Sequence, residues 1–243
     1  MPPSDPKDRL IVALDVDQLG QAESLLDRLS PRVSTFKIGS QLFTAAGPAA
    51  VEIVQKRGGR VFLDLKYHDI PNSVAGAVRE AARLGVFMLN VHASGGGAMM
   101  SAAAQALREE AKGVGARPML LAVTVLTSLD RAALQRELNV PLSVEGHALH
   151  LARLAQASGL DGSVASPQEV RTLRNALGRD WVIVTPGVRP SGGSSDDQAR
   201  VATPEAAIRA GADYLVVGRP ILEASDPEHA AQAFVASIAA ASK

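Results

Sequence analysis

The stretch RLIVALDVD, residues 9–17, contains an unbroken apolar run that ends in two aspartates. Its centre, Ile11-Val12-Ala13-Leu14, has no polar face, which is typical of a strand buried on both sides in a parallel sheet. No glycine cluster follows the run, whereas an open doubly wound sheet usually carries a glycine-rich dinucleotide fingerprint after its first strand. The stretch therefore favours a closed parallel barrel over an open doubly wound sheet.

Seven further apolar runs follow at regular intervals and alternate with amphipathic, alanine-rich segments. The expected strands are Arg9–Val16, Thr35–Gly39, Arg60–Lys66, Phe87–Ala93, Met119–Thr127, Gly159–Ser166, Trp181–Val188 and Tyr214–Arg219. Eight strands in strict alternation with helices, in a chain of 243 residues, predict an α/β protein with a single-domain (β/α)8 TIM barrel. We expect the barrel domain over residues 9–243 and a flexible N-terminal tail over residues 1–8.

The expected helices end mostly at glycines, which stop helices. They are Gln21–Leu29, Pro48–Arg57, Ser73–Leu84, Ala98–Lys112, Ser143–Ser158, Ser166–Leu177, Thr203–Ala210 and Pro227–Ala241. Two of them open with a capping hydroxyl followed by proline, at Ser166-Pro167 and Thr203-Pro204.

Composition narrows the class of protein. Lysine and arginine together number 25, as do aspartate and glutamate, so bulk charge gives no reason to expect binding to nucleic acid or to a membrane surface. The absence of cysteine excludes disulfides, thiol nucleophiles and cysteine-ligated zinc. The polar, proline-rich start has no signal-peptide core, and no run is long enough to span a membrane. We expect a soluble cytoplasmic protein.

Charged residues occupy the C-terminal ends of the expected strands, where barrel enzymes place their chemistry. Asp64 and Lys66 are two apart on one strand and should face the same side, with Lys37 on the neighbouring strand and Asp69 in the following loop. Charges inside apolar strands are rarely buried unless they are paired. The pattern predicts an alternating array of lysines and aspartates, and a structural ion-pair network is the alternative.

A phosphate site is expected in the loops after the seventh and eighth strands. Those loops contain Arg189, Gln198, Gly218 and Arg219, and the glycine would let backbone N–H groups approach an anion. An ordinary turn with a solvated arginine is the alternative. The glycine- and serine-rich segment Arg189–Asp197 would be either a lid or a plain surface loop.

The histidines indicate no metal site. His147 and His150 are spaced as a helical pair, but without a third ligand a solvated helix face is favoured. His68 and His92 lie near strand ends. For each of them, a hydrogen-bonding role and a catalytic role are equally open. A serine hydrolase is poorly supported because no Gly-x-Ser-x-Gly elbow occurs.

The run Asp-Leu-Lys-Tyr-His-Asp-Ile-Pro-Asn, residues 64–72, resembles the orotidine 5′-phosphate decarboxylases of the bacterial type. Shorter similar segments occur in the family's order: Ala13–Asp15, Phe36–Gly39, Asn90–Gly96, Leu126–Ser128, Thr185–Pro190, Asp196–Gln198 and Val217–Pro220. Departures include Ser73, where the family usually has threonine, and Ser195, where it usually has glycine.

The resemblance implies a homodimer with shared active sites and a role for each matching residue. Catalytic roles fall to Lys66 as proton donor to C6 of the pyrimidine, to Asp64 and Lys37 beside it, and to Asp69, which with Ile70 would reach the partner subunit's site. The residues implied to bind the nucleotide are Asp15, Lys37, Asp64, Ile70, Ser73, Thr127, Pro186, Arg189, Gln198, Gly218 and Arg219.

The implied reaction turns orotidine 5′-phosphate into uridine 5′-monophosphate (UMP) in pyrimidine biosynthesis, with no metal and no cofactor. Loss of CO2 would leave a vinyl carbanion without an electron sink, so a preorganised cation at C6 must stabilise it. Two alternatives stay open. One is a magnesium-dependent sugar-phosphate decarboxylase or aldolase of the same barrel superfamily, with an Asp-x-Lys-x-x-Asp core. The other is a non-catalytic phosphate-binding barrel.

Overall fold

Eight parallel strands close into a barrel whose strand order follows the chain, β1-β2-β3-β4-β5-β6-β7-β8. The computed structural model describes residues 3–111, 116–190 and 202–242. The strands are β1 Leu10–Ala13, β2 Thr35–Gly39, β3 Arg60–Tyr67, β4 Met88–His92, β5 Met119–Val123, β6 Gly162–Val164, β7 Val182–Thr185 and β8 Tyr214–Val217. Pairing of β1 with both β2 and β8 closes the ring, so the TIM barrel is confirmed and the open sheet is excluded.

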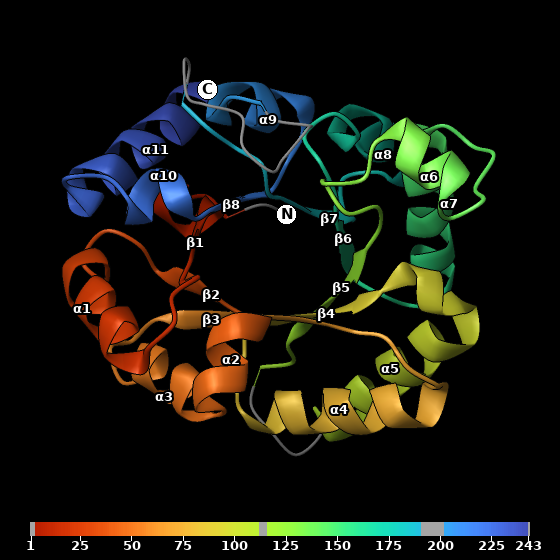
Figure 1. Ribbon diagram of the computed structural model, residues 1–243, viewed down its shortest axis with the longest axis horizontal. Coiled ribbons are helices and arrows are strands. Elements are labelled where there is room, and N and C mark those ends of the chain that lie inside the picture. Colours follow the sequence, from red (N-terminus) through yellow and green to blue (C-terminus); the bar gives the residue numbers. More distant parts are fainter. Residues whose placement is uncertain (1–2, 112–115, 191–201, 243) are drawn as a thin grey trace.

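A ring of helices surrounds the strands (Figure 1). The described α-helices are α1 Leu19–Leu29, α2 Ser40–Ala46, α3 Ala49–Gln55, α4 Pro71–Arg83, α5 Gly96–Glu110, α6 Arg131–Arg136, α7 Val144–Ala157, α8 Val170–Leu177, α9 Pro204–Ala210, α10 Arg219–Leu222 and α11 Pro227–Ala241. Two 3-10 helices, η1 Pro6–Arg9 and η2 Ala93–Gly95, complete the described elements. None of the helices in the described ranges is both long and apolar enough to cross a membrane.

The expected elements are confirmed in kind but several boundaries differ. Thr203 caps α9 through a hydrogen bond from the N–H of Ala206, as its Thr-Pro signature predicts. The same signature at Ser166 is misleading, because α8 begins only at Val170. Residues 6–8 of the expected flexible tail form part of η1, which Asp5 caps.

Two apolar clusters explain why the strands are buried on both faces. A small cluster fills the inside of the barrel and consists of Ile11, Ala13, Phe62, Met88, Leu121, Val184, Tyr214 and Val216. The larger cluster lies between the sheet and the helices and includes the alternate residues of the same strands, such as Val12, Leu63 and Leu89. Three residues of the inner cluster, Ala13, Phe62 and Val216, also line the cavity described below, so this cluster forms its apolar floor.

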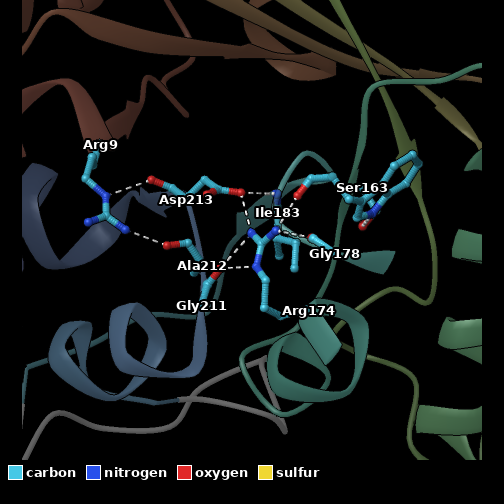
Figure 2. A network of polar contacts seen from close by, with 9 residues as sticks. Arg9, Ser163, Arg174, Gly178, Ile183, Gly211, Ala212 and Asp213 are labelled. Carbon is cyan, nitrogen blue, oxygen red and sulfur yellow. Dashed lines mark hydrogen bonds and ion pairs between the residues drawn. The ribbon is translucent and has the colours of Figure 1, made fainter. Parts of the chain in front are cut away.

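Two arginines tie the barrel together at the N-terminal ends of its strands (Figure 2). Arg9 donates to the backbone oxygens of Ala212 and Asp213 at 2.6 and 3.0 Å. Arg174 donates to the carbonyl of Gly211 and forms a 2.7 Å ion pair with Asp213, whose carboxylate also accepts from the N–H of Ile183. These contacts join η1, α8, β7 and the residues that lead into β8, at the end of the barrel opposite the charged array.

The sixth strand is close to its neighbour and tolerates no side chain at its start. A Cβ added to Gly162 would lie 2.2 Å from the carbonyl oxygen of Val182 on β7. Next to it, Ser163 is fully buried and accepts a 3.0 Å hydrogen bond from the indole N–H of Trp181. The low apolar content of this strand therefore reflects tight packing against β7.

Candidate active site

Four charged side chains form a continuous array at the C-terminal ends of the first three strands. Lys37 on β2 lies between two carboxylates, with its Nζ 2.9 Å from Oδ1 of Asp15 and 3.4 Å from Oδ2 of Asp64. Lys66 lies beyond Asp64, with its Nζ 2.8 Å from Oδ1 of that carboxylate. The order in space is Asp15–Lys37–Asp64–Lys66, in which the charges alternate.

The inner part of the array is buried and the outer lysine is more open. The side chains of Lys37 and Asp64 are about one tenth exposed, whereas that of Lys66 is 34% exposed. Burial alone would lower the pKa of Lys37, but the charges of Asp64 and Asp15 outweigh it and raise the pKa above its ordinary value. Lys37 is therefore a permanent cation at neutral pH, and Lys66 is the cation that faces the open end of the site.

The end of β3 departs from regular strand geometry at Lys66. Lys66 has a φ of 51°, in the left-handed region that non-glycine residues rarely occupy. Asn90 on β4 is fully buried beside it and bonds to both Lys66 and Asp64. Asn90 is a functional candidate beyond those expected from the sequence, although a polar residue in the apolar strand Met88–His92 is the same kind of signal that indicates Asp64.

The array forms one wall of a cavity of about 550 Å³, which is large enough for a nucleotide-sized ligand. Nine of the residues expected at the site line this cavity: Asp15, Lys37, Asp64, Lys66, Thr127, Pro186, Arg189, Gly218 and Arg219. They come from six different strands or the segments that follow them. Gln41, Ser166 and Glu223 also line the cavity and are not among the residues expected from the sequence.

The two ends of the site meet at the junction of β1 and β8. A Cβ placed on Gly218 would be 3.5 Å from Oδ2 of Asp15, so the backbone after β8 runs beside the first carboxylate of the array. Arg219 and Arg189 line the cavity on this side. The cavity thus has a charge-alternating wall at β1–β3 and an arginine-bearing side at β7–β8.

Three expected site residues do not line the cavity of their own chain. Asp69, Ile70 and Ser73 lie at or near the start of α4 and are exposed, Ile70 to 66%. The carboxylate of Asp69 accepts a 2.6 Å hydrogen bond from the N–H of Ile70. Gln198 and most of the segment expected to be a lid, Arg189–Asp197, lie outside the described residues.

Four of the five histidines form two pairs. The rings of His68 and His92 are 5.5 Å apart, and burial, with smaller contributions from His68 and Lys66, lowers the pKa of His92. The rings of His147 and His150 are stacked 6.3 Å apart on α7. In the ranges that the structure describes, no group of three or more histidine, aspartate or glutamate side chains is placed to hold a metal ion.

Comparison with known proteins agrees with this geometry. Residues 8–234 match the sequence profile of the family described as orotidine 5′-phosphate decarboxylase / HUMPS. The orotidine 5′-phosphate decarboxylase of Moorella thermoacetica is 59% identical over 96% of this chain and 92% of that protein. That of Geotalea daltonii is 53% identical over 96% of both chains.

Solved structures show the same architecture. The crystal structure of orotidine 5′-phosphate decarboxylase from Lactobacillus acidophilus superposes with a TM-score of 0.84 at 38% identity, covering 95% of this chain and 99% of that one. An uncharacterized conserved protein from Geobacillus kaustophilus superposes with a TM-score of 0.83 at 35% identity, covering 94% and 99%. With a matching profile over nearly its whole length and relatives at this level of identity, the chain belongs to the orotidine 5′-phosphate decarboxylase / HUMPS family.

Proposed function

We propose that this protein converts orotidine 5′-monophosphate to UMP and CO2, a step of pyrimidine biosynthesis, without a metal or cofactor. The observation that carries the proposal is the Lys66 ammonium group, held 2.8 Å from Asp64 on the wall of a nucleotide-sized cavity. The family and the names of its relatives support the same reaction.

Lys66 is proposed to act on C6 of the pyrimidine ring. As the bond between C6 and the carboxylate breaks, its electron pair stays on C6, and CO2 leaves. The ammonium group stabilises this negative charge and then donates a proton to C6, after which Lys66 regains a proton from water. An ammonium fixed in place before the reaction needs no reorganisation when the charge develops.

Asp64 and Lys37 are proposed to hold that ammonium in place. Asp64 is bound on both sides by lysines, which holds its carboxylate in place beside the Lys66 ammonium group. Lys37 and Asp15, paired at 2.9 Å, would bind the ribose hydroxyls, and Thr127 and Pro186 would contact the pyrimidine from the other side of the cavity.

The arginine-bearing side of the cavity is proposed to bind the 5′-phosphate. Arg189, Arg219 and the backbone at Gly218 would do so, because guanidinium groups form paired hydrogen bonds with phosphate oxygens. Gln198 is proposed to join them and to bridge phosphate and base. The phosphate is remote from the bond that breaks, so its binding energy would serve to orient the ring.

We further propose that the active protein is a homodimer in which Asp69, Ile70 and Ser73 serve the partner's site. Two observations support this arrangement. These residues do not line the cavity of their own chain, and Ile70 is a large apolar side chain that is 66% exposed. A two-fold dimer that buries Ile70 would complete both sites at once.

Release of CO2 from orotidine 5′-phosphate by purified, metal-free protein tests the proposed function. We expect full activity after treatment with EDTA. Activity lost with EDTA and restored by magnesium would favour the sugar-phosphate class of the superfamily. Binding of UMP without any CO2 release would favour a non-catalytic phosphate-binding barrel.

A further inference from the structure

Strands β3 and β4 are paired unevenly next to the catalytic array. Leu63 is paired with Leu89, and Tyr67 is paired with Val91. Between these two pairs β3 has three residues, whereas β4 has only Asn90. The regular ladder of hydrogen bonds is therefore interrupted where Asp64 and Lys66 are placed.

The side chain of Asn90 fills the interruption. Its Oδ1 accepts a 2.8 Å hydrogen bond from the backbone N–H of Lys66. Its Nδ2 donates at 2.6 Å to Oδ1 of Asp64, the same oxygen that faces the Lys66 ammonium group. Asn90 is fully buried, so water does not compete for either bond.

These two bonds act on two separate aspects of the site. The bond to the Lys66 N–H satisfies a backbone donor that the ladder leaves without a strand partner, and so stabilises the rare left-handed conformation at φ 51°. The bond to Asp64 fixes the rotation of the carboxylate, with Oδ1 toward Lys66 and Oδ2 toward Lys37. One neutral amide thus stabilises the backbone conformation of Lys66 and also fixes the orientation of its counterion, Asp64.

We propose that Asn90 is a positioning residue for the reaction. It does not line the cavity. It acts through Lys66, by holding the ammonium group in the position from which it donates a proton to C6 of the pyrimidine. This inference rests on the proposed function, in which Lys66 is the proton donor.

Asn90→Ala removes both bonds and tests the proposal. We expect kcat for orotidine 5′-phosphate to fall on the order of 100-fold, because displacement of a reacting group by about 1 Å has an effect of this size. The KM and the dissociation constant of UMP should change little, because the ribose and phosphate contacts are intact. The rate at which the C6 hydrogen of bound UMP exchanges with D2O, followed by NMR, should fall in parallel, because that exchange also needs a correctly placed Lys66.

Ser163→Ala is the matched control. Ser163 is another fully buried polar residue on a barrel strand, and its hydroxyl bonds to Trp181 away from the cavity. Its loss should lower stability without changing kcat or C6 exchange. Near-UV circular dichroism and UMP binding show whether each variant is folded.

Asn90→Asp is a second variant that does not depend on how well the alanine variant folds. The new side chain keeps an acceptor for the Lys66 N–H but places a second carboxyl group against Asp64. The titratable groups around it are Asp64 and Lys66 from β3, Lys37 from β2 and His92 from β4, while its partner on β5 is the apolar Leu121.

Two carboxyl groups this close share a proton, and the protonated form can donate as the amide does. The activity of Asn90→Asp relative to wild type should therefore rise as the pH falls. A residue with only a structural role would give a ratio that does not depend on pH.

The outcomes separate the two proposals. Wild-type protein without CO2 release would overturn the proposed function itself. With active wild type, unchanged kcat and C6 exchange in folded Asn90→Ala, or a pH-independent ratio for Asn90→Asp, would overturn the positioning role alone. Loss in kcat and C6 exchange with UMP binding retained would support it.

Discussion

Lys66 and Asp64 form a 2.8 Å ion pair between side chains two residues apart on one strand, at the open wall of the cavity. Lys66→Ala should abolish turnover, because no other described cation occupies its place beside Asp64 on the open side. The protein should stay folded and bind UMP, since Asp64 keeps its bond to Lys37. The checks are CO2 release, circular dichroism and calorimetric titration with UMP.

Lys56→Ala provides the control for that substitution. Lys56 follows α3, its side chain is 71% exposed, and it pairs with the exposed Glu52 one helical turn earlier. It should retain wild-type activity. Near-normal turnover in Lys66→Ala would contradict the role of Lys66 as the proton donor.

Asp69 is predicted to act in the partner's site. Lys66→Ala and Asp69→Ala dimers should each be inactive, but subunit exchange between them should restore about a quarter of the wild-type activity, because half of the dimers are then mixed and each has one complete site. Activity is measured after exchange is verified with two differently tagged subunits. No recovery would place Asp69 in the site of its own chain.

The ion pair between Arg174 and Asp213 is predicted to stabilise the barrel without affecting chemistry. Their side chains are 15% and 8% exposed, so Asp213→Ala would leave a largely buried arginine without its counterion, at a cost of about 3–5 kcal/mol. Urea unfolding at neutral pH measures this loss. The kcat of the folded fraction should be unchanged.

Arg83→Ala is the comparison for this prediction. Arg83 pairs with Glu80 and Glu110 on the surface, and its side chain is 53% exposed. Exposed pairs contribute about 0–1 kcal/mol, so this variant should unfold at nearly the wild-type urea concentration. Equal losses in the two variants would show that burial of the Arg174 pair has no special effect.

His92 is predicted to make the protein less stable in mild acid. Burial is the main cause of its lowered pKa, so the unfolded chain gains a proton near the ordinary value of 6.5 while the folded chain does not. The free energy of unfolding should therefore decrease as the pH falls through 6.5. In His92→Gln the difference between urea unfolding at pH 7.5 and at pH 5.5 should be smaller than in wild type, with the remainder due in part to His147. An unchanged difference would contradict the prediction.

The sequence predicts the strands and long helices well because their apolar patterns are long. Short helices such as α2, α6 and α10 are not predicted, since four to seven residues show little periodicity. The start of α8 differs for a tertiary reason. Glu169 is almost fully buried and accepts a hydrogen bond from the N–H of Ser166, which forms a turn where the Ser-Pro signature predicts the first helical residues.

The presence of the charged array is predictable from the strand pattern. The backbone conformation at Lys66 and the contacts that support it are not. Adjacent parallel strands bring Lys37 beside Asp64, which follows once the strands are assigned. The left-handed backbone of Lys66 depends on the pairing of β3 with β4, which no local pattern specifies. The role of Asn90 is harder to predict because the residue carries no charge, although a buried amide is costly unless it is hydrogen-bonded.

The contacts that Arg9 and Arg174 make lie at one end of the barrel, and the array with Lys66 lies at the other, with the apolar inner cluster between them. For laboratory evolution this arrangement offers two nearly independent regions. Heat tolerance can be selected among residues around Asp213, and altered substrate preference among the segments that follow the strands at the opposite end, so gains in one property need not be lost through the other.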